Sequence, residues 1–303
     1  MYPLVSICIP IFNGEQFIVE AMESAINQSY ANLEIVISDD ASKDTTLQLI
    51  EKFKEKTQIP IQIYNHVPNG IGANWNNCIE QAKGEYIKFL FQDDVLKPNC
   101  IEEMVNVLEH DKAIGLVASK REFIIEESHL TEETKKWIKG YGNLQEDLSL
   151  TLIDGIQYLD KNLFKSNLFL EDPKNKVGEP SAVLFNKKLV KKIGYFREDL
   201  KQNLDYEFYY RILKKYKIAI LEKELVKFRL HKQQATNANR GNDDHDYVKY
   251  DKIIYKDYFW YLNVKKKKDL LKRYNPIVKL FFKYNSIPKI YRKVKMKLKI
   301  LSH

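Results

Sequence analysis

The sequence has few cysteines and no long hydrophobic segment. Three cysteines occur in 303 residues, and Cys8, Cys78 and Cys100 are scattered through apolar or amphipathic stretches. They lack the pairing of a secreted disulfide scaffold and the spacing of a zinc site, so they indicate a reducing compartment. No apolar run approaches the roughly 20 residues of a membrane-spanning helix. No secretory signal pattern precedes the first expected strand. We therefore expect a cytoplasmic protein.

Acidic side chains are nearly missing from the C-terminal tail. Tyr258 to His303 carries 14 Lys and Arg and a single acid, Asp269, whereas residues 1–257 carry 35 basic and 40 acidic groups. The formal net charge of +8 is therefore a property of the tail. Nucleic-acid binding needs a basic surface on the folded body, so we expect no nucleic acid partner.

The first 119 residues alternate between strand and helix patterns. Short β-branched runs predict strands over residues 5–10, 33–38, 59–64, 86–91 and 115–118, with amphipathic helices between them. Such alternation predicts a mainly parallel sheet covered by helices on both faces. No G-x-G-x-x-G follows the first strand, where Pro10-Ile-Phe-Asn13 stands instead, and this argues against a nicotinamide dehydrogenase.

The second half is less regular. Residues 126–150 are polar and charged, which predicts a loop. A returning strand is expected at 180–185 and a helix at 205–216. Residues 235–246 are rich in Asn, Gly and Asp, which predicts a linker before a lysine-rich helical remainder.

Two pairs of adjacent aspartates stand at the ends of expected strands. Asp39-Asp40 follows the second strand and Asp93-Asp94 follows the fourth. In parallel sheets, ligands bind beyond the carboxyl ends of the strands. Adjacent carboxylates repel one another unless positive charge lies beside them, and a hard divalent cation that also binds a diphosphate meets that need. The alternative is a solvated turn in which Asp94 caps the next segment.

The order and spacing of several motifs resemble those of the family 2 glycosyltransferases. The resemblance covers roughly residues 4–237. It rests on Val5-Ser-Ile-Cys-Ile-Pro-Ile-Phe-Asn-Gly14, Glu34-Ile-Val-Ile-Ser-Asp-Asp-Ala-Ser-Lys-Asp-Thr45, Asn69-Gly-Ile-Gly72, Ala82-Lys-Gly-Glu-Tyr-Ile-Lys-Phe-Leu-Phe-Gln-Asp-Asp94, Gly178-Glu-Pro-Ser-Ala-Val-Leu-Phe185 and Asp205-Tyr-Glu-Phe-Tyr-Tyr-Arg211.

The resemblance implies an α/β fold of the A type, with a mainly parallel nucleotide-binding sheet sandwiched by helices. It implies a glycosyltransferase domain over residues 1–237, divided into a nucleotide-sugar half (1–119) and an acceptor-side half (120–237). Residues 238–303 then form a basic helical C-terminal extension.

The same resemblance implies a nucleotide-sugar donor, with uracil expected as the base, and Mn²⁺ or Mg²⁺ as the cofactor. The implied donor-binding residues are Pro10, Ile11, Phe12, Asn13, Asp40, Asn69, Gly72, Asn76, Gln92 and Asp93. Asp93, Asp94 and His231 are the implied metal-site residues, and a purely structural histidine is the alternative for His231. Many members carry Asp-x-Asp-Asp where this chain has Phe91-Gln-Asp-Asp94, so the first carboxylate is absent.

The implied reaction is inverting transfer, which needs a carboxylate base. Asp205 matches the family's base position, and capping of its helix is the alternative. Glu207 is a reserve candidate on the acceptor side. Glu179 is expected either to orient an acceptor or to stabilise a turn.

The basic tail alternates cationic and apolar residues, as in Lys265-Lys-Lys-Lys268 and Ile277-Val-Lys-Leu-Phe-Phe-Lys283. Such segments can lie in the interface of an anionic membrane, or they can be ordinary surface helices. Membrane attachment would place the protein peripherally on the inner face of the cell membrane. The implied acceptor is a glycan or lipid-linked glycan in surface polysaccharide synthesis. The alternative to an enzyme is a catalytically silent nucleotide-sugar or membrane-binding module.

Overall fold

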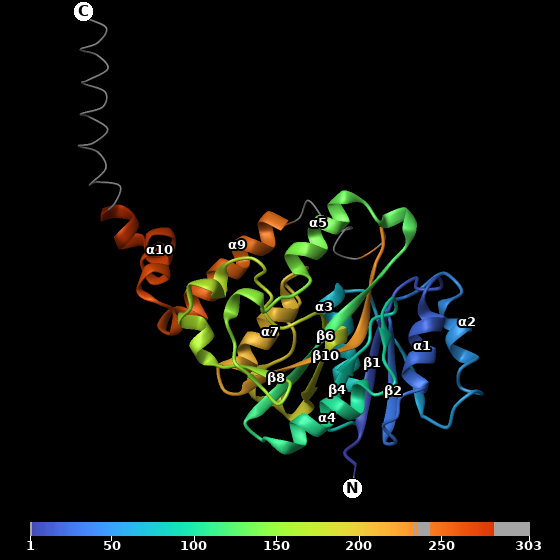
Figure 1. Cartoon of the computed structure of the whole chain (residues 1–303). Coiled ribbons are helices and arrows are strands. Elements are labelled where there is room, and N and C mark those ends of the chain that lie inside the picture. Colours follow the sequence, from blue (N-terminus) through green and yellow to red (C-terminus); the bar gives the residue numbers. More distant parts are fainter. Residues whose placement is uncertain (1, 233, 235–242, 282–303) are drawn as a thin grey trace, which may run out of the picture.

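A mixed, mostly parallel sheet forms the centre of the computed structural model, which describes residues 2–232, 234 and 243–281 (Figure 1). Ten strands are present in these residues, in the order β3-β2-β1-β4-β9-β6-β10-β8-β7, with β5 paired to β10. The strands are β1 (Val5–Ile11), β2 (Leu33–Asp39), β3 (Ile61–Asn65), β4 (Tyr86–Phe89), β5 (Val95–Leu96), β6 (Ile114–Ile125), β7 (Leu152–Ile153), β8 (Ile156–Leu159), β9 (Val183–Asn186) and β10 (Lys217–Leu230).

Helices cover both faces of this sheet. α1 (Ile18–Ile26), α2 (Thr46–Glu51) and α4 (Cys100–His110) pack on one face, and α3 (Ile71–Gln81) and α7 (Leu204–Leu213) on the other. The remaining α-helices of the described residues are α5 (Glu132–Tyr141), α6 (Val190–Ile193), α9 (Asp243–Ile253) and α10 (Val264–Tyr274), and α10 lies away from the sheet (Figure 1). β3, β2, β1 and β4 are parallel, β9 runs antiparallel between β4 and β6, and β10 is parallel to β6. The long β6–β10 pair thereby carries residues from both halves of the chain to one edge of the sheet.

The central strands are buried on both sides because their side chains alternate between two hydrophobic cores. Ile7 and Ile9 of β1 pack with α1 and α4, whereas Cys8 between them packs with α3 and α7. Every residue of β1 and β2 is buried. Near-continuous apolar strands of this kind are expected of a parallel sheet under helices on both faces, which confirms the fold predicted from the sequence.

Two parts of the second half differ from the sequence prediction. Residues 126–150 are not only a loop, because they contain α5, which Thr131 caps through a 3.1 Å hydrogen bond from the Thr134 amide. The 14-residue strand β10 was not predicted at all. Residues 222–224 in its middle are charged and exposed, and ion pairs such as Lys120–Glu222 (3.4 Å) offset those charges. Hydrophobic periodicity therefore fails there.

The described part of the basic extension is helical and packs on the body. Tyr250, Ile254, Tyr258 and Leu270 are buried in the same hydrophobic core as α7. The expected linker 235–246 lies mostly outside the described residues, although α9 begins within it at Asp243. In the described parts of the chain, no helix has both the length and the apolar character needed to span a membrane.

Gly84 at the entry to β4 gives a direct test of this packing. A Cβ at Gly84 would lie 2.6 Å from the Ser6 amide nitrogen and 2.9 Å from the Leu4 carbonyl oxygen. We expect Gly84→Ala to lower the free energy of unfolding by about 1–3 kcal/mol in urea denaturation. Gly140→Ala in α5 is the control, because no atom lies within 4 Å of its added Cβ. It should gain up to about 1 kcal/mol. Equal effects of the two changes would contradict the packing described at β4.

Candidate functional site

The Asp93-Asp94 pair lies just beyond β4 and is held by the end of β10. The Arg229 amide donates to Asp94 Oδ1 (3.1 Å), and Arg229 Nε donates to the Asp93 carbonyl oxygen (2.9 Å). His231 Nε2 lies 2.9 Å from Asp93 Oδ2. Asp93 and Asp94 are therefore held by residues more than 130 positions later in the sequence. We call this pair, with Arg229 and His231, the acidic edge.

Asp94 is the more buried member of the pair. It is 1% exposed, and its Oδ2 is buried without a hydrogen-bond partner. Burial raises the pKa of the Asp94 carboxyl well above its usual value, and the neighbouring Asp93 charge adds to the rise, while the nearby Ser181 hydroxyl and the Arg229 amide oppose it. An added cation would satisfy both the free oxygen and the repulsion.

Arg229, near the end of β10, and His231, just beyond that strand, lie against the same aromatic ring. The Arg229 guanidinium lies 4.6 Å from the centre of the Phe17 ring, and the His231 ring is 4.8 Å from the same ring. Arg229 also forms a 2.7 Å ion pair with Glu20 of α1. The resemblance pointed to His231, but Arg229, two residues earlier in the sequence, was not predicted.

A cleft of about 630 Å³ opens beside this edge. Its lining comes from the turns after β1, β2 and β4 and from the residue after β10, and consists of Phe12, Asn13, Gly14, Glu15, Gln16, Phe17, Lys43, Asp44, Gln92 and His231. Four of the predicted site residues thus meet here: Phe12, Asn13, Gln92 and His231. Pro10 and Ile11 are buried within β1, so their side chains do not line the cleft.

Gln92 joins the turn after β4 to the turn after β1. Its Oε1 accepts from the Phe12 amide (2.9 Å) and its Nε2 donates to the Phe12 carbonyl oxygen (3.1 Å). Asn13 Oδ1 in turn accepts from the Lys43 amide (2.9 Å). Gln92 therefore uses its amide to shape the cleft, which differs from the direct donor contact that we predicted.

Asp40 has a partner that the sequence did not suggest. His66 Nδ1 lies 2.7 Å from Asp40 Oδ1, and both side chains are mostly buried. Asn69 lies four residues after the end of β3. It is exposed and does not line the cleft beside His231. One oxygen of the Asp40 carboxylate is therefore already paired with His66.

Asn76 and Gly72 of α3 contact the chain before α7 instead of a ligand. Asn76 exchanges hydrogen bonds with the backbone of Phe196, at 2.9 and 3.0 Å, and is buried. A Cβ at Gly72 would lie 3.0 Å from the Arg197 carbonyl oxygen, so glycine permits a close approach of two segments. The donor-binding roles predicted for these two residues are therefore corrected to structural ones.

Phe91 occupies the position where a carboxylate was expected. Its ring lies 5.0 Å from that of Trp75, which also packs against Phe89 and Phe196. The replacement is therefore part of an aromatic cluster, and Asp93 and Asp94 are the carboxylates that remain in this turn.

Asp205 lies in the first turn of α7, next to Asn175. Asn175 Nδ2 donates to Asp205 Oδ2 (2.9 Å), while Oδ1 is buried without a hydrogen-bond partner. Burial raises the pKa of Asp205 to about 7, with a further rise from the Glu179 charge. Backbone amides at the start of α7 and the Asn175 side chain act in the opposite direction. A carboxyl with this pKa can exchange a proton near neutral pH.

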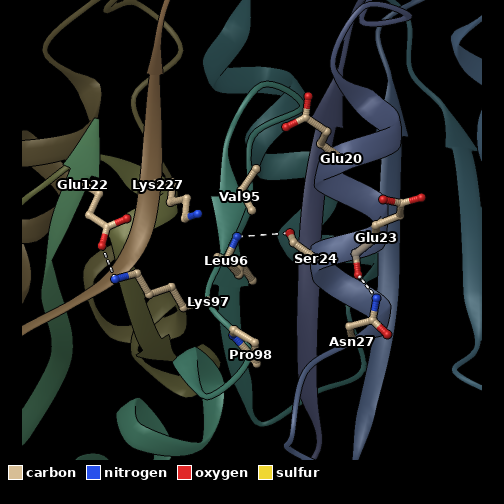
Figure 2. Close-up of a pocket in the computed structure, with 10 residues that line it drawn as sticks. All are labelled: Glu20, Glu23, Ser24, Asn27, Val95, Leu96, Lys97, Pro98, Glu122 and Lys227. Carbon is tan, nitrogen blue, oxygen red and sulfur yellow. Dashed lines mark hydrogen bonds and ion pairs between the residues drawn. The ribbon is translucent and has the colours of Figure 1, made fainter. Parts of the chain in front are cut away.

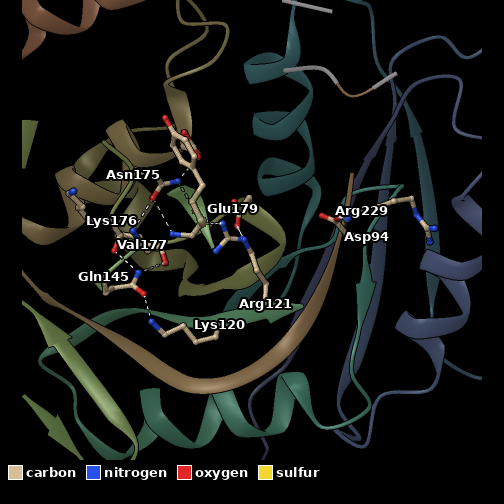
Figure 3. Close-up of polar contacts among 12 residues, drawn as sticks. Asp94, Lys120, Arg121, Gln145, Asn175, Lys176, Val177, Glu179 and Arg229 are labelled. Carbon is tan, nitrogen blue, oxygen red and sulfur yellow. Dashed lines mark hydrogen bonds and ion pairs between the residues drawn. The ribbon is translucent and has the colours of Figure 1, made fainter. Parts of the chain in front are cut away.

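Glu179 stands between the two acidic centres. Its Oε2 forms a 2.7 Å ion pair with Arg121 Nε, whose alignment is poor for a hydrogen bond. Its charge raises the pKa values of both Asp94 and Asp205. Figure 3 shows the Arg121–Glu179 pair between Asn175 and the Asp94–Arg229 contact. Asn175, which also accepts from the Gly178 amide (3.0 Å), carried no sequence signal.

Helix geometry points the Glu207 side chain away from Asp205 and Glu179. Two residues along an α-helix point to nearly opposite sides, so Asp205 and Glu207 diverge. Glu207 is buried and binds Arg211 through contacts of 2.9 and 3.1 Å. Arg211 also donates to the Tyr195 carbonyl oxygen (2.7 Å). The prediction of Glu207 as a reserve base is therefore corrected to a structural ion pair.

The acidic edge fits a divalent cation only in part. Among the described residues, no three His, Cys, Asp or Glu side chains converge as a complete metal site. Mg²⁺ and similar ions are commonly held by one or two carboxylates, with substrate phosphates and water completing the shell. The free Asp94 Oδ2 and the Asp93 carboxylate suit that incomplete arrangement.

A second cavity, of about 590 Å³, lies between α1 and β5 (Figure 2). None of the predicted site residues lines it. Its rim includes Glu20, the partner of Arg229, and Lys97, which pairs with Glu122. The cavity therefore borders the Arg229–Glu20 ion pair, which lies next to the Asp93-Asp94 turn.

Replacing Arg229 and Glu20 separately would test this support. We expect Arg229→Ala to cost about 1–3 kcal/mol in urea unfolding, because it removes the guanidinium donor of the part-buried Asp93 carbonyl oxygen, whereas the backbone amide that donates to Asp94 is retained. Glu20→Gln should cost under about 1 kcal/mol, because its carboxylate is largely exposed. If Glu20→Gln proved as costly as Arg229→Ala, the surface ion pair and not the Asp93 contact would be the main stabilising interaction.

Comparison with known proteins agrees with this geometry. The profile of glycosyl transferase family 2 matches residues 6–194. A protein of Rickettsia typhi named as an uncharacterized glycosyltransferase is 31% identical over 242 residues, covering 78% of this chain and 67% of the relative. A Haemophilus influenzae protein named in the same way is 29% identical over 267 residues, covering 84% and 74%. Chondroitin synthase of Escherichia coli is 32% identical over 135 residues, covering 45% of this chain and 20% of the synthase.

Solved structures share the fold. S. aureus TarS in complex with UDP-GlcNAc superposes with a TM-score of 0.64 at 19% identity, covering 89% of this chain and 71% of that chain. The mannosyltransferase PcManGT from Pyrobaculum calidifontis, in complex with GDP-Man and Mn²⁺, gives a TM-score of 0.59 at 13% identity, covering 100% and 85%. The chain therefore belongs to glycosyl transferase family 2 and has the A-type glycosyltransferase fold.

Proposed function

We propose that this protein is an inverting glycosyltransferase that moves a sugar from a nucleotide sugar to a hydroxyl group of a glycan or lipid-linked glycan. The observation that carries the proposal is the placement of two distinct carboxyl centres at one sheet edge. Asp93-Asp94 is tied to Arg229 and His231, and the isolated Asp205 lies beyond Glu179. Two differently perturbed carboxyl groups suit two different tasks in one reaction.

The donor is proposed to be a UDP-sugar bound along the cleft from Phe12 and Asn13 to His231. The backbone of this cleft is fixed by the Gln92 contacts with Phe12, so the pocket is formed before a ligand enters. The proposal of UDP is supported by the crystal structure of S. aureus TarS in complex with UDP-GlcNAc. Asp40 would contact the base through the oxygen that does not face His66.

The proposed cofactor is Mn²⁺ or Mg²⁺, held by Asp93 and Asp94. When bound, such an ion supplies positive charge to the departing nucleoside diphosphate. His231, at 2.9 Å from Asp93, would orient that carboxylate, and Arg229 would keep the pair at the edge. The PcManGT complex with Mn²⁺ supports metal use by this fold.

Asp205 is the proposed base. In inverting transfer, the acceptor oxygen forms a bond to the anomeric carbon as the bond to the diphosphate breaks, and the hydroxyl proton passes to the Asp205 carboxylate. A pKa of about 7 keeps this carboxylate available near neutral pH while giving it enough basicity to accept the proton. Asn175 would hold it in position.

The proposed acceptor is a glycan in surface polysaccharide synthesis. The similarity to chondroitin synthase, which covers under half of this chain, supports this proposal. The alternative, a silent nucleotide-sugar-binding module, would keep donor binding without turnover. Glu179, paired with Arg121, is proposed to border the acceptor and to stabilise the turn that begins at Asn175.

A combined binding and turnover experiment tests the proposal. With Mn²⁺ and UDP-GlcNAc at about 100 times the Kd, thermal unfolding should show about 2.7 kcal/mol of stabilisation. The same mixture should release UDP by transfer or slow hydrolysis. Asp94→Asn should abolish the metal-dependent stabilisation, while Asp205→Asn should retain it and lose turnover. Stabilisation of the wild type without turnover on any UDP-, GDP- or dTDP-sugar would favour the silent module.

The pH dependence of turnover follows from Asp205. The base must be ionised, so we expect kcat to fall as pH decreases through about 7. Because the Asn175 hydrogen bond lowers the pKa of Asp205, Asn175→Ala should move this acid limb to higher pH. Pre-steady-state rates from pH 5 to 9 would measure the shift. An acid limb unchanged by Asn175→Ala would argue against Asp205 as the base.

The raised pKa of Asp205 also predicts how the free energy of unfolding changes with pH. Its pKa is raised in the folded state, so folding disfavours the ionised form, and the stability cost grows as pH rises from about 4 to about 7. Asp205→Asn should therefore unfold at a higher urea concentration than the wild type at pH 8, and the difference should shrink towards pH 4. If Asp205→Asn were less stable than the wild type at pH 8, the ionised Asp205 carboxylate would not destabilise the folded state as described.

A further inference from the structure

The end of the described chain presents a surface of apolar and cationic side chains that glycosyl transfer does not use. We name it the tail face and define it by Trp260, Tyr261, Val264, Lys265, Lys268, Lys272, Ile277, Lys279 and Leu280. All nine side chains are exposed. They lie on and beside α10, at the opposite end of the molecule from α1 and α2 (Figure 1).

α10 presents one side to the body and the other to solvent. Leu270 is buried, while Val264, Lys265, Lys268 and Lys272 recur at three- and four-residue spacing on the opposite side of the helix. This arrangement places the lysines of the tail face away from the protein core.

The basic residues divide in the same way. Lys266 and Arg273, on the sides of α10 nearer the body, form ion pairs with Glu171 and Asp251. In contrast, the side chains of Lys265 and Lys268 form no ion pair or hydrogen bond with any residue in the described ranges. Lys265 and Lys268 therefore keep their ammonium groups open to solvent, although the Lys265 charge also acts on Glu171 at longer range.

Trp260 is the strongest apolar signal of the tail face. It is 84% exposed, although its neighbours Tyr258 and Leu262 are buried and fix the backbone on either side. Asn263 Nδ2 also binds the Lys165 carbonyl oxygen (3.2 Å), which ties the start of α10 to the body. A rigidly presented tryptophan beside lysines is typical of side chains that enter the membrane–water interface.

A second apolar group follows the end of α10. Asn275 Oδ1 accepts from the Val278 amide (3.1 Å) and starts a helical segment over residues 276–281. Ile277 is 78% exposed and Leu280 is 55% exposed, and their three-residue spacing places them on one side. Lys279 lies between them in the sequence.

We propose that the tail face binds the surface of an anionic lipid bilayer. Trp260, Val264, Ile277 and Leu280 would enter the boundary between headgroups and acyl chains, and Lys265, Lys268, Lys272 and Lys279 would contact lipid phosphates. Exposed aliphatic side chains gain nothing from a nucleic acid backbone, so charge and apolar area together favour a membrane over a polyanion in water. Seven more Lys and Arg and no acid follow in residues 282–303 of the sequence.

Vesicle binding by the full chain tests this proposal. The vesicles contain phosphatidylcholine with 30% phosphatidylglycerol, or phosphatidylcholine alone. The test variant is Lys265→Gln/Lys268→Gln/Lys272→Gln. The matched control is Lys52→Gln/Lys191→Gln/Lys215→Gln, which removes the same charge from exposed lysines elsewhere. Each lysine near an anionic surface contributes about fivefold to partitioning. The test variant should therefore lose about 100-fold and the control under about threefold.

Trp260 supplies a second, independent readout. Addition of the anionic vesicles should shift its fluorescence to shorter wavelength, and Trp260→Ala should lose this shift and weaken binding. Trp137→Phe is the control, because it removes a half-buried tryptophan outside the tail face. The proposal is overturned if the wild type does not bind anionic vesicles, or if the test and control variants bind equally. Equal binding to both kinds of vesicle, or tighter binding to a DNA duplex with no Trp260 shift, would also overturn it.

Discussion

The contact between the end of β10 and the Asp93-Asp94 turn is the constraint on which the site depends. Two carboxyl groups on adjacent residues repel one another, and one of them is almost wholly buried. Arg229 holds both through its amide and guanidinium groups, while His231 meets Asp93 from the same side of the strand. β10 can deliver these groups because it runs parallel to β6 for most of its length. The acidic edge is therefore a product of sheet topology.

Unbalanced negative charge is the second theme of the site. Glu179 raises the pKa values of both Asp94 and Asp205, although Arg121 neutralises part of its charge. Burial lowers the pKa of Lys88 in β4, the Asp94 charge opposes this shift, and the Lys88 ammonium donates to the Ser181 carbonyl oxygen. Sites in which neighbouring carboxyl groups have separated proton affinities are suited to acid–base chemistry. A bound cation would complete this balance.

The sequence allowed much of the fold and the acidic edge to be predicted, because both depend on local patterns. β1 and β4 are buried throughout and rich in apolar residues, and Asp93-Asp94 lies in the turn that follows β4. Prediction failed where tertiary partners decide a role. Asn76 looked like a ligand-binding amide but binds the Phe196 backbone, and Glu207 looked like a base but is held by Arg211. Asn175 had no signal because its role arises only when α7 packs beside its turn.

Crystals grown with UDP and Mn²⁺, measured at a wavelength where manganese scatters anomalously, would test the central claim most directly. The account predicts one strong anomalous peak within coordination distance of the Asp93 or Asp94 carboxylate, with the diphosphate on its other side and the uracil towards Asp40. A manganese peak away from both aspartates, or UDP bound in another cavity, would contradict the assignment of this edge as the nucleotide-sugar site.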